Sequence, residues 1–189
     1  MCLIGLNFFN EGGEFMTILV CIIQFFEWEV EPSKVALYLA FICLPQAFSF
    51  FFALLADTTS AFGYQKKFYV VLPAFLQVLS AFTITVSSFD DYSIKKRERL
   101  FVLYVSLIML ARSILTPVIQ GLMIIQMKKD KEFGSEDLET FGHICEGAGA
   151  VFFGIFGGIK IGRDEDISPL DFFFLTGFVG ILLIIAGCA

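Results

Sequence analysis

Long apolar runs, separated by short polar stretches, constrain the fold of this chain more than any other feature of its sequence. A helix needs about 20 mostly apolar residues to cross the hydrocarbon core of a bilayer, and several runs here reach that length. Of the 189 residues, 57% are hydrophobic and 17% are charged, whereas a soluble domain is about 45–50% apolar and about 25% charged. We therefore expect an integral, multi-pass membrane protein.

The polar stretches between the runs predict six membrane-spanning helices, at about 2–28, 35–56, 68–89, 100–127, 138–161 and 168–189. Backbone polar groups within a bilayer must be satisfied inside the protein, and the sequence shows no run of β-type alternation. The predicted fold class is therefore all-α, a transmembrane helix bundle. The whole chain, residues 1–189, is expected to form a single transmembrane domain.

Several function classes are disfavoured by the sequence. The five cysteines lie in or beside apolar runs, without a Cys or His partner at metal-binding spacing, so we expect no metal site or other cofactor. No nucleophile motif or phosphate-binding loop is visible, which argues against an enzyme. A net charge of −6 without a basic patch argues against binding to nucleic acid.

The first span carries acidic residues where lipid-facing residues would be apolar. Its segment "NFFNEGGEF" holds Glu11 and Glu14 on either side of Gly12 and Gly13. Two adjacent glycines weaken a helix, by about 1 kcal/mol each, and carboxylates beside a helix break are typical of transporter sites for substrate or protons. An alternative is that the true span is shorter and that this segment is an amphipathic lead-in at the membrane interface.

Charged and polar residues also interrupt the fourth and fifth spans. Arg112 and Gln120 are about two helical turns apart and so lie near the same face, and Pro117 between them should kink the helix near Ser113. Glu146 lies in the fifth span and could pair with Arg112. That pair could be merely structural, or its members could form part of a substrate or proton pathway.

Small residues recur every four positions in the fifth span, at Ala150, Gly154 and Gly158. At this spacing they lie on one face of a helix and let a neighbouring backbone approach closely. We expect them to mediate helix packing, with contact to a ligand as the alternative.

One segment resembles a known family. "LPQAFSFFFALLADTTSAFGYQKKFYVVLPAFLQ" is similar to the second helix, tight loop and third helix of the folate–biopterin transporter family of the major facilitator superfamily. The matching positions are Leu44-Pro45, Asp57, Phe62-Gly63-Tyr64, Lys66-Lys67 and Tyr69. The resemblance implies a six-helix bundle equivalent to the N-terminal half of a major facilitator fold.

The chain also departs from the family pattern. A lysine-proline pair of the family is replaced by Phe48-Ser49, and two acids of its fourth helix by Thr116 and Gln120. A position that is often basic in the fifth helix is Glu146. These changes prevent a direct transfer of substrate identity from the family to this chain.

The loop after the second span is expected to act as a conformational latch, formed by Asp57, Gly63, Tyr64, Lys66 and Lys67. Gly63 allows an unusual backbone angle in a tight turn. Asp57 can face the positive N-terminal end of a neighbouring helix, and the lysines can lie at the headgroup level. Alternatively, the loop only marks a helix end and anchors its lysines.

The resemblance, together with the charged residues inside the spans, implies a secondary transporter that moves folate- or pterin-like organic anions by alternating access. The alternative is a transport-inactive structural subunit of a larger membrane complex, which the missing acids at Thr116 and Gln120 favour. One half cannot enclose a transport path, so we expect a partial gene product or a dimer of two copies. The family topology places Lys66-Lys67 and Lys128 to Lys131 in the cytoplasm, although the count of Lys and Arg weakly favours the reverse.

Overall fold

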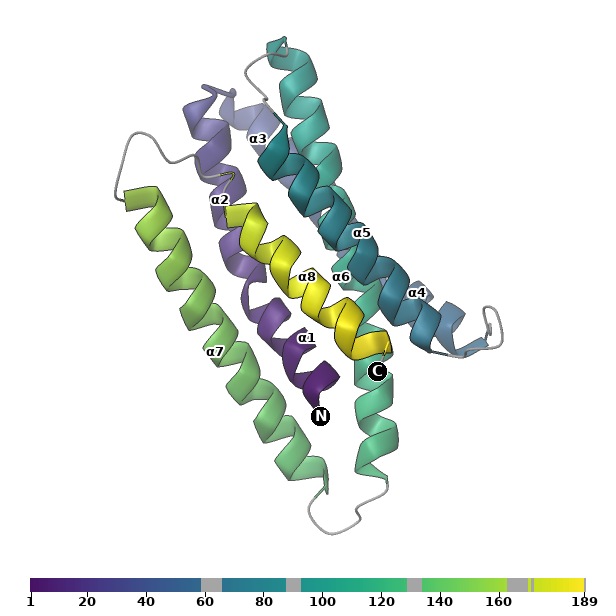
Figure 1. Cartoon of the computed structure of the whole chain (residues 1–189). Coiled ribbons are helices and arrows are strands. Elements are labelled where there is room, and N and C mark those ends of the chain that lie inside the picture. Colours follow the sequence, from purple (N-terminus) through teal and green to yellow (C-terminus); the bar gives the residue numbers. More distant parts are fainter. Residues whose placement is uncertain (59–65, 88–92, 129–133, 163–169, 171, 189) are drawn as a thin grey trace.

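The computed structural model of the chain describes residues 1–58, 66–87, 93–128, 134–162, 170 and 172–188. Helices account for nearly all of these residues (Figure 1). In chain order they are α1 (Cys2–Gly12), α2 (Glu14–Glu27), α3 (Pro32–Ala47), α4 (Ser49–Thr58), α5 (Lys67–Val86), α6 (Ile94–Met127), α7 (Gly134–Gly162) and α8 (Phe172–Cys188). The described part of the chain contains no strand, as the all-α prediction requires.

Four helical stretches are long and apolar enough to cross a membrane, within the described part of the chain: 2–27, 32–58, 67–86 and 95–127. They correspond to the first four predicted spans. The apolar helix α8 has only 17 residues, and α7 carries acidic residues in its first turn at Glu136 and Asp137. The crossing of a membrane by α7 and α8 therefore stays a prediction, while the multi-pass membrane character of the chain is established.

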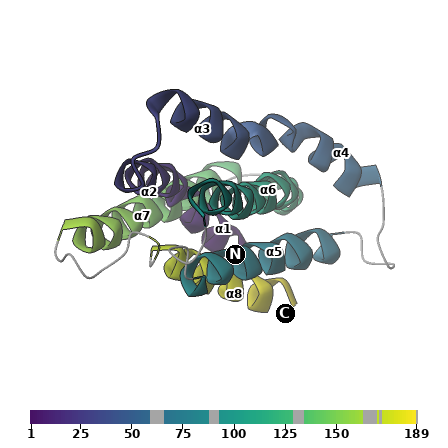
Figure 2. The ribbon, with the colours of Figure 1, turned by 90° about the horizontal axis from the view of Figure 1, so that it is seen from above.

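The helices form a bundle whose layers are visible from above (Figure 2). α3 and α4 lie along one side and pack on α6, while α5 and α8 lie along the opposite side and pack on each other. Between them, α1 packs on α7, and α6 contacts both outer layers through α3, α4 and α5. This arrangement places α6 at the centre of the bundle.

Two of the four spanning stretches are interrupted near the middle. The first is divided at Gly13, whose N–H is hydrogen-bonded to the carbonyl of Asn10 at 3.2 Å, three residues back. The second is divided at Phe48, whose N–H bonds the carbonyl of Pro45 at 3.1 Å. By contrast, α6 continues through Pro117 as one helix.

Glycines bring α1 and α7 into close backbone contact. A Cβ added at Gly149 would collide with the backbone carbonyl of Phe9, and one at Gly12 would collide with the carbonyl of Glu146 and lie 2.6 Å from the N of Ala150. Real Cβ atoms essentially never approach other atoms this closely. The two helices can therefore pack at this distance only because both positions are glycine.

This contact uses a different face of α7 from the predicted packing stripe, whose role in packing stays a prediction. No atom of the described residues lies within 4 Å of a Cβ added at Gly154 or Gly158, and Ala150 is exposed. The face that packs on α1 and α2 instead contains Gly142, Gly149 and Phe153. Spacing alone could not distinguish the two faces, because α7 has small residues on both.

Part of the predicted latch is visible at the end of α4. The carboxylate of Asp57 forms a salt bridge at 3.4 Å with the ammonium of Lys66, which is the residue before the first turn of α5. Lys67 bonds instead to the carbonyl of Cys188, at 3.5 Å. Gly63 and Tyr64 lie outside the described residues. Asp57 thus meets the N-terminal end of α5, through a lysine, and its role as a latch stays a prediction.

Asp57→Asn should leave insertion and stability nearly unchanged but slow transport. The Asp57 side chain is 68% exposed, and an exposed ion pair contributes at most about 1 kcal/mol to stability. The measurement is uptake by a version of the chain that is completed with its second half, divided by the amount of protein at the membrane surface. Lys66→Gln should have the same effect and Lys67→Gln should not. Equal uptake by the Asp57→Asn variant and the unmodified chain would exclude the latch.

Candidate functional site

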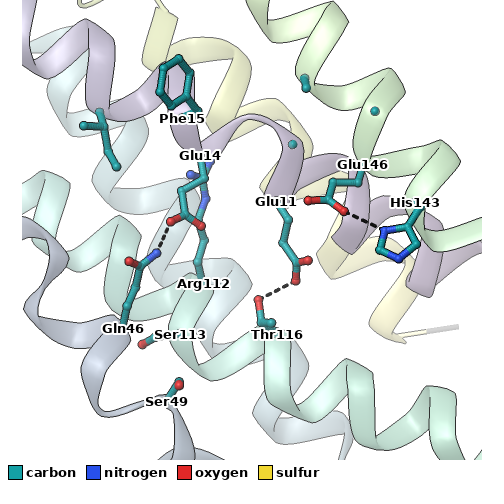
Figure 3. Close-up of a pocket in the computed structure, with 14 residues that line it drawn as sticks. Glu11, Glu14, Phe15, Gln46, Ser49, Arg112, Ser113, Thr116, His143 and Glu146 are labelled. Carbon is teal, nitrogen blue, oxygen red and sulfur yellow. Dashed lines mark hydrogen bonds and ion pairs between the residues drawn. The ribbon is translucent and has the colours of Figure 1, made fainter. Parts of the chain in front are cut away.

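A cavity of about 800 Å³ lies where the two interrupted helices approach α6 and α7 (Figure 3). The residues around it share a position next to a helix break or on the inner faces of α6 and α7. They are Glu11, Gly12, Glu14, Phe15, Ile18, Gln46, Ser49, Arg112, Ser113, Thr116, His143, Glu146, Gly147 and Ala150. Gly12 and Glu14 flank the break at Gly13, while Gln46 and Ser49 flank the break at Phe48. The cavity therefore lies beside both helix breaks, where the regular backbone hydrogen bonding of the helices is interrupted.

Arg112 is the only arginine or lysine in the lining, and its side chain is 2% exposed. Its Nη1 donates to the hydroxyl of Thr17 at 3.2 Å, and its Nη2 donates to the Oδ1 of Asn10 at 3.4 Å. Both acceptors are neutral. No carboxylate of the described residues lies within salt-bridge distance of Arg112, and its Nε has no hydrogen-bond partner among those residues.

The contacts of Arg112 show whether it forms the ion pair with Glu146 that the sequence allowed. The pair with Glu146 is not formed, since the carboxylate of Glu146 lies 3.3 Å from the Nδ1 of His143 on its own helix. Glu14 and Glu11 are close enough to Arg112 for electrostatic attraction. The guanidinium is thus hydrogen-bonded to neutral groups and attracted by two nearby carboxylates, neither of which forms a salt bridge with it.

Glu11 and Glu14 point to opposite neighbours from the two ends of the first helix break (Figure 3). One oxygen of Glu11 accepts hydrogen bonds from Asn7 and from Thr116 of α6, each at 2.7 Å. The carboxylate of Glu14 accepts a hydrogen bond from Gln46 of α3. These contacts connect the first break to α6 and to the second break.

Most of the predicted pathway residues meet at this cavity, since Glu11, Glu14, Arg112 and Glu146 all belong to its lining. Gln120 does not, because it is exposed on α6 and absent from the lining. The eight residues from Arg112 to Gln120 exceed two helical turns by about 80° of rotation, which is enough to remove Gln120 from the cavity. The prediction that they share a site is therefore not supported by their positions.

Sequence reasoning missed three polar residues that organise the site. Gln46 follows Pro45 at the second break, and Thr17 follows Gly13 by four residues, so that its hydroxyl donates to the Gly13 carbonyl at 3.0 Å. Gln77 is fully buried in α5. Each of them is a polar residue with an apolar neighbour on both sides, and that signal could have identified them.

The chemistry of the lining suits a ligand with both acidic and hydrogen-bond-donating groups. One fixed cation, Arg112, faces a space that also contains three carboxylates, from Glu11, Glu14 and Glu146. A carboxylate on a ligand would satisfy the donors of Arg112, and N–H groups on the same ligand would satisfy the acids. No cluster of metal-binding side chains occurs in the described parts of the chain.

Comparison with known proteins is consistent with this chemistry. The model of one family, described as the BT1 family, matches residues 14–187 of the chain. No curated protein and no solved structure matches the chain.

Proposed function

The chain belongs to the BT1 family, whose members are membrane transporters of the folate–biopterin type, and we propose that its cavity binds a folate- or pterin-like organic anion for transport. The observation that carries this proposal is the buried guanidinium of Arg112 at the cavity, hydrogen-bonded to neutral groups alone among the described residues. A permanent charge at mid-membrane needs a counter-charge, water or a ligand. Glu11 and Glu14 attract Arg112 from a distance, and an anionic substrate would add the direct ion pair that neither of them forms.

The volume and polarity of the cavity support this class of ligand. Small-molecule sites in proteins are typically about 300–1,000 Å³, and the cavity has about 800 Å³. A pterin ring carries an amino group and ring N–H groups, which are donors for carboxylates such as Glu11 and Glu146. Its carboxylate-bearing side chain would extend toward Arg112. Phe15 and Ile18 supply the apolar part of the lining.

The interrupted helices support a mechanism of alternating access. Discontinuous helices that meet at a mid-membrane site are a recurring feature of secondary transporters. The hydrogen bond between Glu14 and Gln46 joins the segments beside the two breaks, at Gly13 and Phe48. A ligand that competes for Glu14 would weaken this connection and allow the two helices to move separately.

Thr116 supports transport over the alternative of an inactive subunit. The resemblance places an acid at this position, and its loss argued against transport. The Thr116 hydroxyl donates to the carboxylate of Glu11 at 2.7 Å. A carboxylate therefore still lies at this part of the cavity, although it comes from α1 instead of α6.

We further expect a second six-helix unit to complete the path. The residues that α7 contributes to the lining include His143, Gly147 and Ala150, all of which are exposed. A ligand bound there would be covered on that side only by another unit, either a second half or a second copy of this chain. Cross-linking in native membranes would identify that unit.

Saturable binding of folate or pterin-6-carboxylate by the chain in lipid nanodiscs is the expected result. Tritiated ligand would be titrated against the purified protein, with unlabelled ligand and an unrelated aromatic carboxylate as competitors. Displacement by the pterin and not by the unrelated acid supports the proposal. Absence of saturable binding to every pterin tested would contradict it and favour the structural-subunit alternative.

A further inference from the structure

A second polar layer lies behind the cavity, away from its lining. Its centre is Gln77 of α5, whose side chain is fully buried and does not contribute to the cavity. The carboxamide of Gln77 forms a reciprocal pair with the carboxamide of Asn10: Gln77 donates to Asn10 Oδ1 at 3.0 Å and accepts from Asn10 Nδ2 at 3.1 Å. Gln77 also donates to the backbone carbonyl of Thr176 in α8, at 3.0 Å.

The Thr176 carbonyl determines which way both amides point. A backbone carbonyl is only an acceptor, so the Gln77 group facing it must be the NH₂. The Oε1 of Gln77 then faces the NH₂ of Asn10, from which it accepts. The Oδ1 of Asn10 accepts from the NH₂ of Gln77 and is shared with the Nη2 of Arg112.

The same logic holds for the second partner of Arg112. The hydroxyl hydrogen of Thr17 is donated to the carbonyl of Gly13, which leaves the hydroxyl lone pairs to accept from Nη1. Arg112 is thus held by two neutral acceptors whose orientation is set by backbone carbonyls. One of these two chains of contacts, from α8 through α5 to α1, depends entirely on Gln77.

We propose that Gln77 is a positioning residue that orients Arg112 toward the ligand by fixing the direction of the Asn10 amide. Without Gln77, the Asn10 amide loses both hydrogen bonds that hold it in position, so the oxygen that accepts from the Nη2 of Arg112 is no longer fixed by α5. The inference rests on the proposed anion-binding function of the cavity. It assigns Gln77 a role in affinity for the anionic group of the ligand, without any contact to the ligand.

The test compares two ligands that differ by one negative charge and one methyl group, pterin-6-carboxylate and its neutral methyl ester. Their dissociation constants would be measured in nanodiscs for the unmodified chain and for Gln77→Met, which keeps a similar side-chain length and removes every hydrogen bond. Gln77→Leu repeats the test with a different shape. The expected result is a fall of about tenfold in the preference for the carboxylate, because a hydrogen bond to a charged group is weakened.

Gln24 offers a matched control. It is also a buried glutamine, 3% exposed, and it bonds to Glu27 at 2.9 Å, away from Asn10 and Arg112. Gln24→Met should leave the preference for the carboxylate unchanged. Affinity for the neutral ester reports whether each variant is folded, since that ligand does not depend on the charge of Arg112.

Combining the Gln77 and Arg112 substitutions distinguishes failure of the positioning role from failure of the proposed function. If Gln77 acts through Arg112, Gln77→Met should cause no further loss of preference in the Arg112→Gln background. An unchanged preference in both Gln77 variants, with a loss in Arg112→Gln, would overturn the positioning role and leave the proposed function intact. An unchanged preference in Arg112→Gln would overturn the proposed function, and the inference with it.

Discussion

Arg112→Gln should weaken the binding of a pterin carboxylate by at least about 30-fold, because loss of one partner of a buried, hydrogen-bonded charge pair costs about 2–5 kcal/mol. Glutamine can still reach neutral acceptors but carries no charge. Affinity for the methyl ester of the same pterin should change little. The dissociation constants of both ligands in nanodiscs are the measurement, and equal loss for the two would contradict anion binding by Arg112.

Two further variants define what Arg112 supplies. Arg112→Lys keeps the charge but loses the planar fork that can bind a carboxylate through two nitrogens, and should show an intermediate affinity. Arg99→Gln makes the same substitution at an exposed position of α6 and should have no effect on either ligand. If Arg99→Gln matched the loss in Arg112→Gln, the effect would come from net charge and not from the cavity.

Replacement of Arg112 should affect the stability of the protein differently from its affinity for the ligand. The neutral partners Thr17 and Asn10 keep other hydrogen bonds, to Gly13 and to Gln77, when Arg112 is replaced. No carboxylate of a salt bridge is left behind, so the large destabilisation that a buried pair with Glu146 would cause is not expected. Melting in detergent should show a midpoint equal to or above that of the unmodified chain.

Gly149→Leu should destabilise the bundle more than any other single change on α7. Its side chain would occupy the space of the Phe9 backbone, and overpacking costs about 1–3 kcal/mol even where side chains can shift. Here the obstacle is the backbone of α1, so α1 and α7 must separate. The change should lower the melting temperature and also impair ligand binding, because Glu11 and Glu146 come from these two helices.

Gly154→Leu is the matched control, since it makes the same substitution five residues further along the same helix. A Cβ at Gly154 meets no described atom within 4 Å, and leucine favours helix over glycine by close to 1 kcal/mol. This variant should melt at or above the temperature of the unmodified chain. The packing assignment is wrong if both variants lose stability to the same extent.

Hydropathy, helix breaks and family were accessible from the sequence because each depends on local properties. Whether a segment favours lipid depends on the summed transfer free energy of its own side chains. Two glycines weaken a helix wherever they occur, and the break found at Gly13 follows from "EGGE". The tight-loop motif that includes Asp57 and Lys66 is likewise a contiguous string of residues, which allowed the family to be recognised.

The tertiary structure alone decided which residues face one another. Successive residues are rotated by about 100° around a helix, so a small difference in helix rotation exchanges one partner for another. Glu146 turned to His143 instead of Arg112, and Gly149 instead of Gly154 met the neighbouring helix. The link from Thr176 through Gln77 and Asn10 to Arg112 joins residues of four helices. Such a contact depends on the packing of the whole bundle, and no single stretch of sequence encodes it.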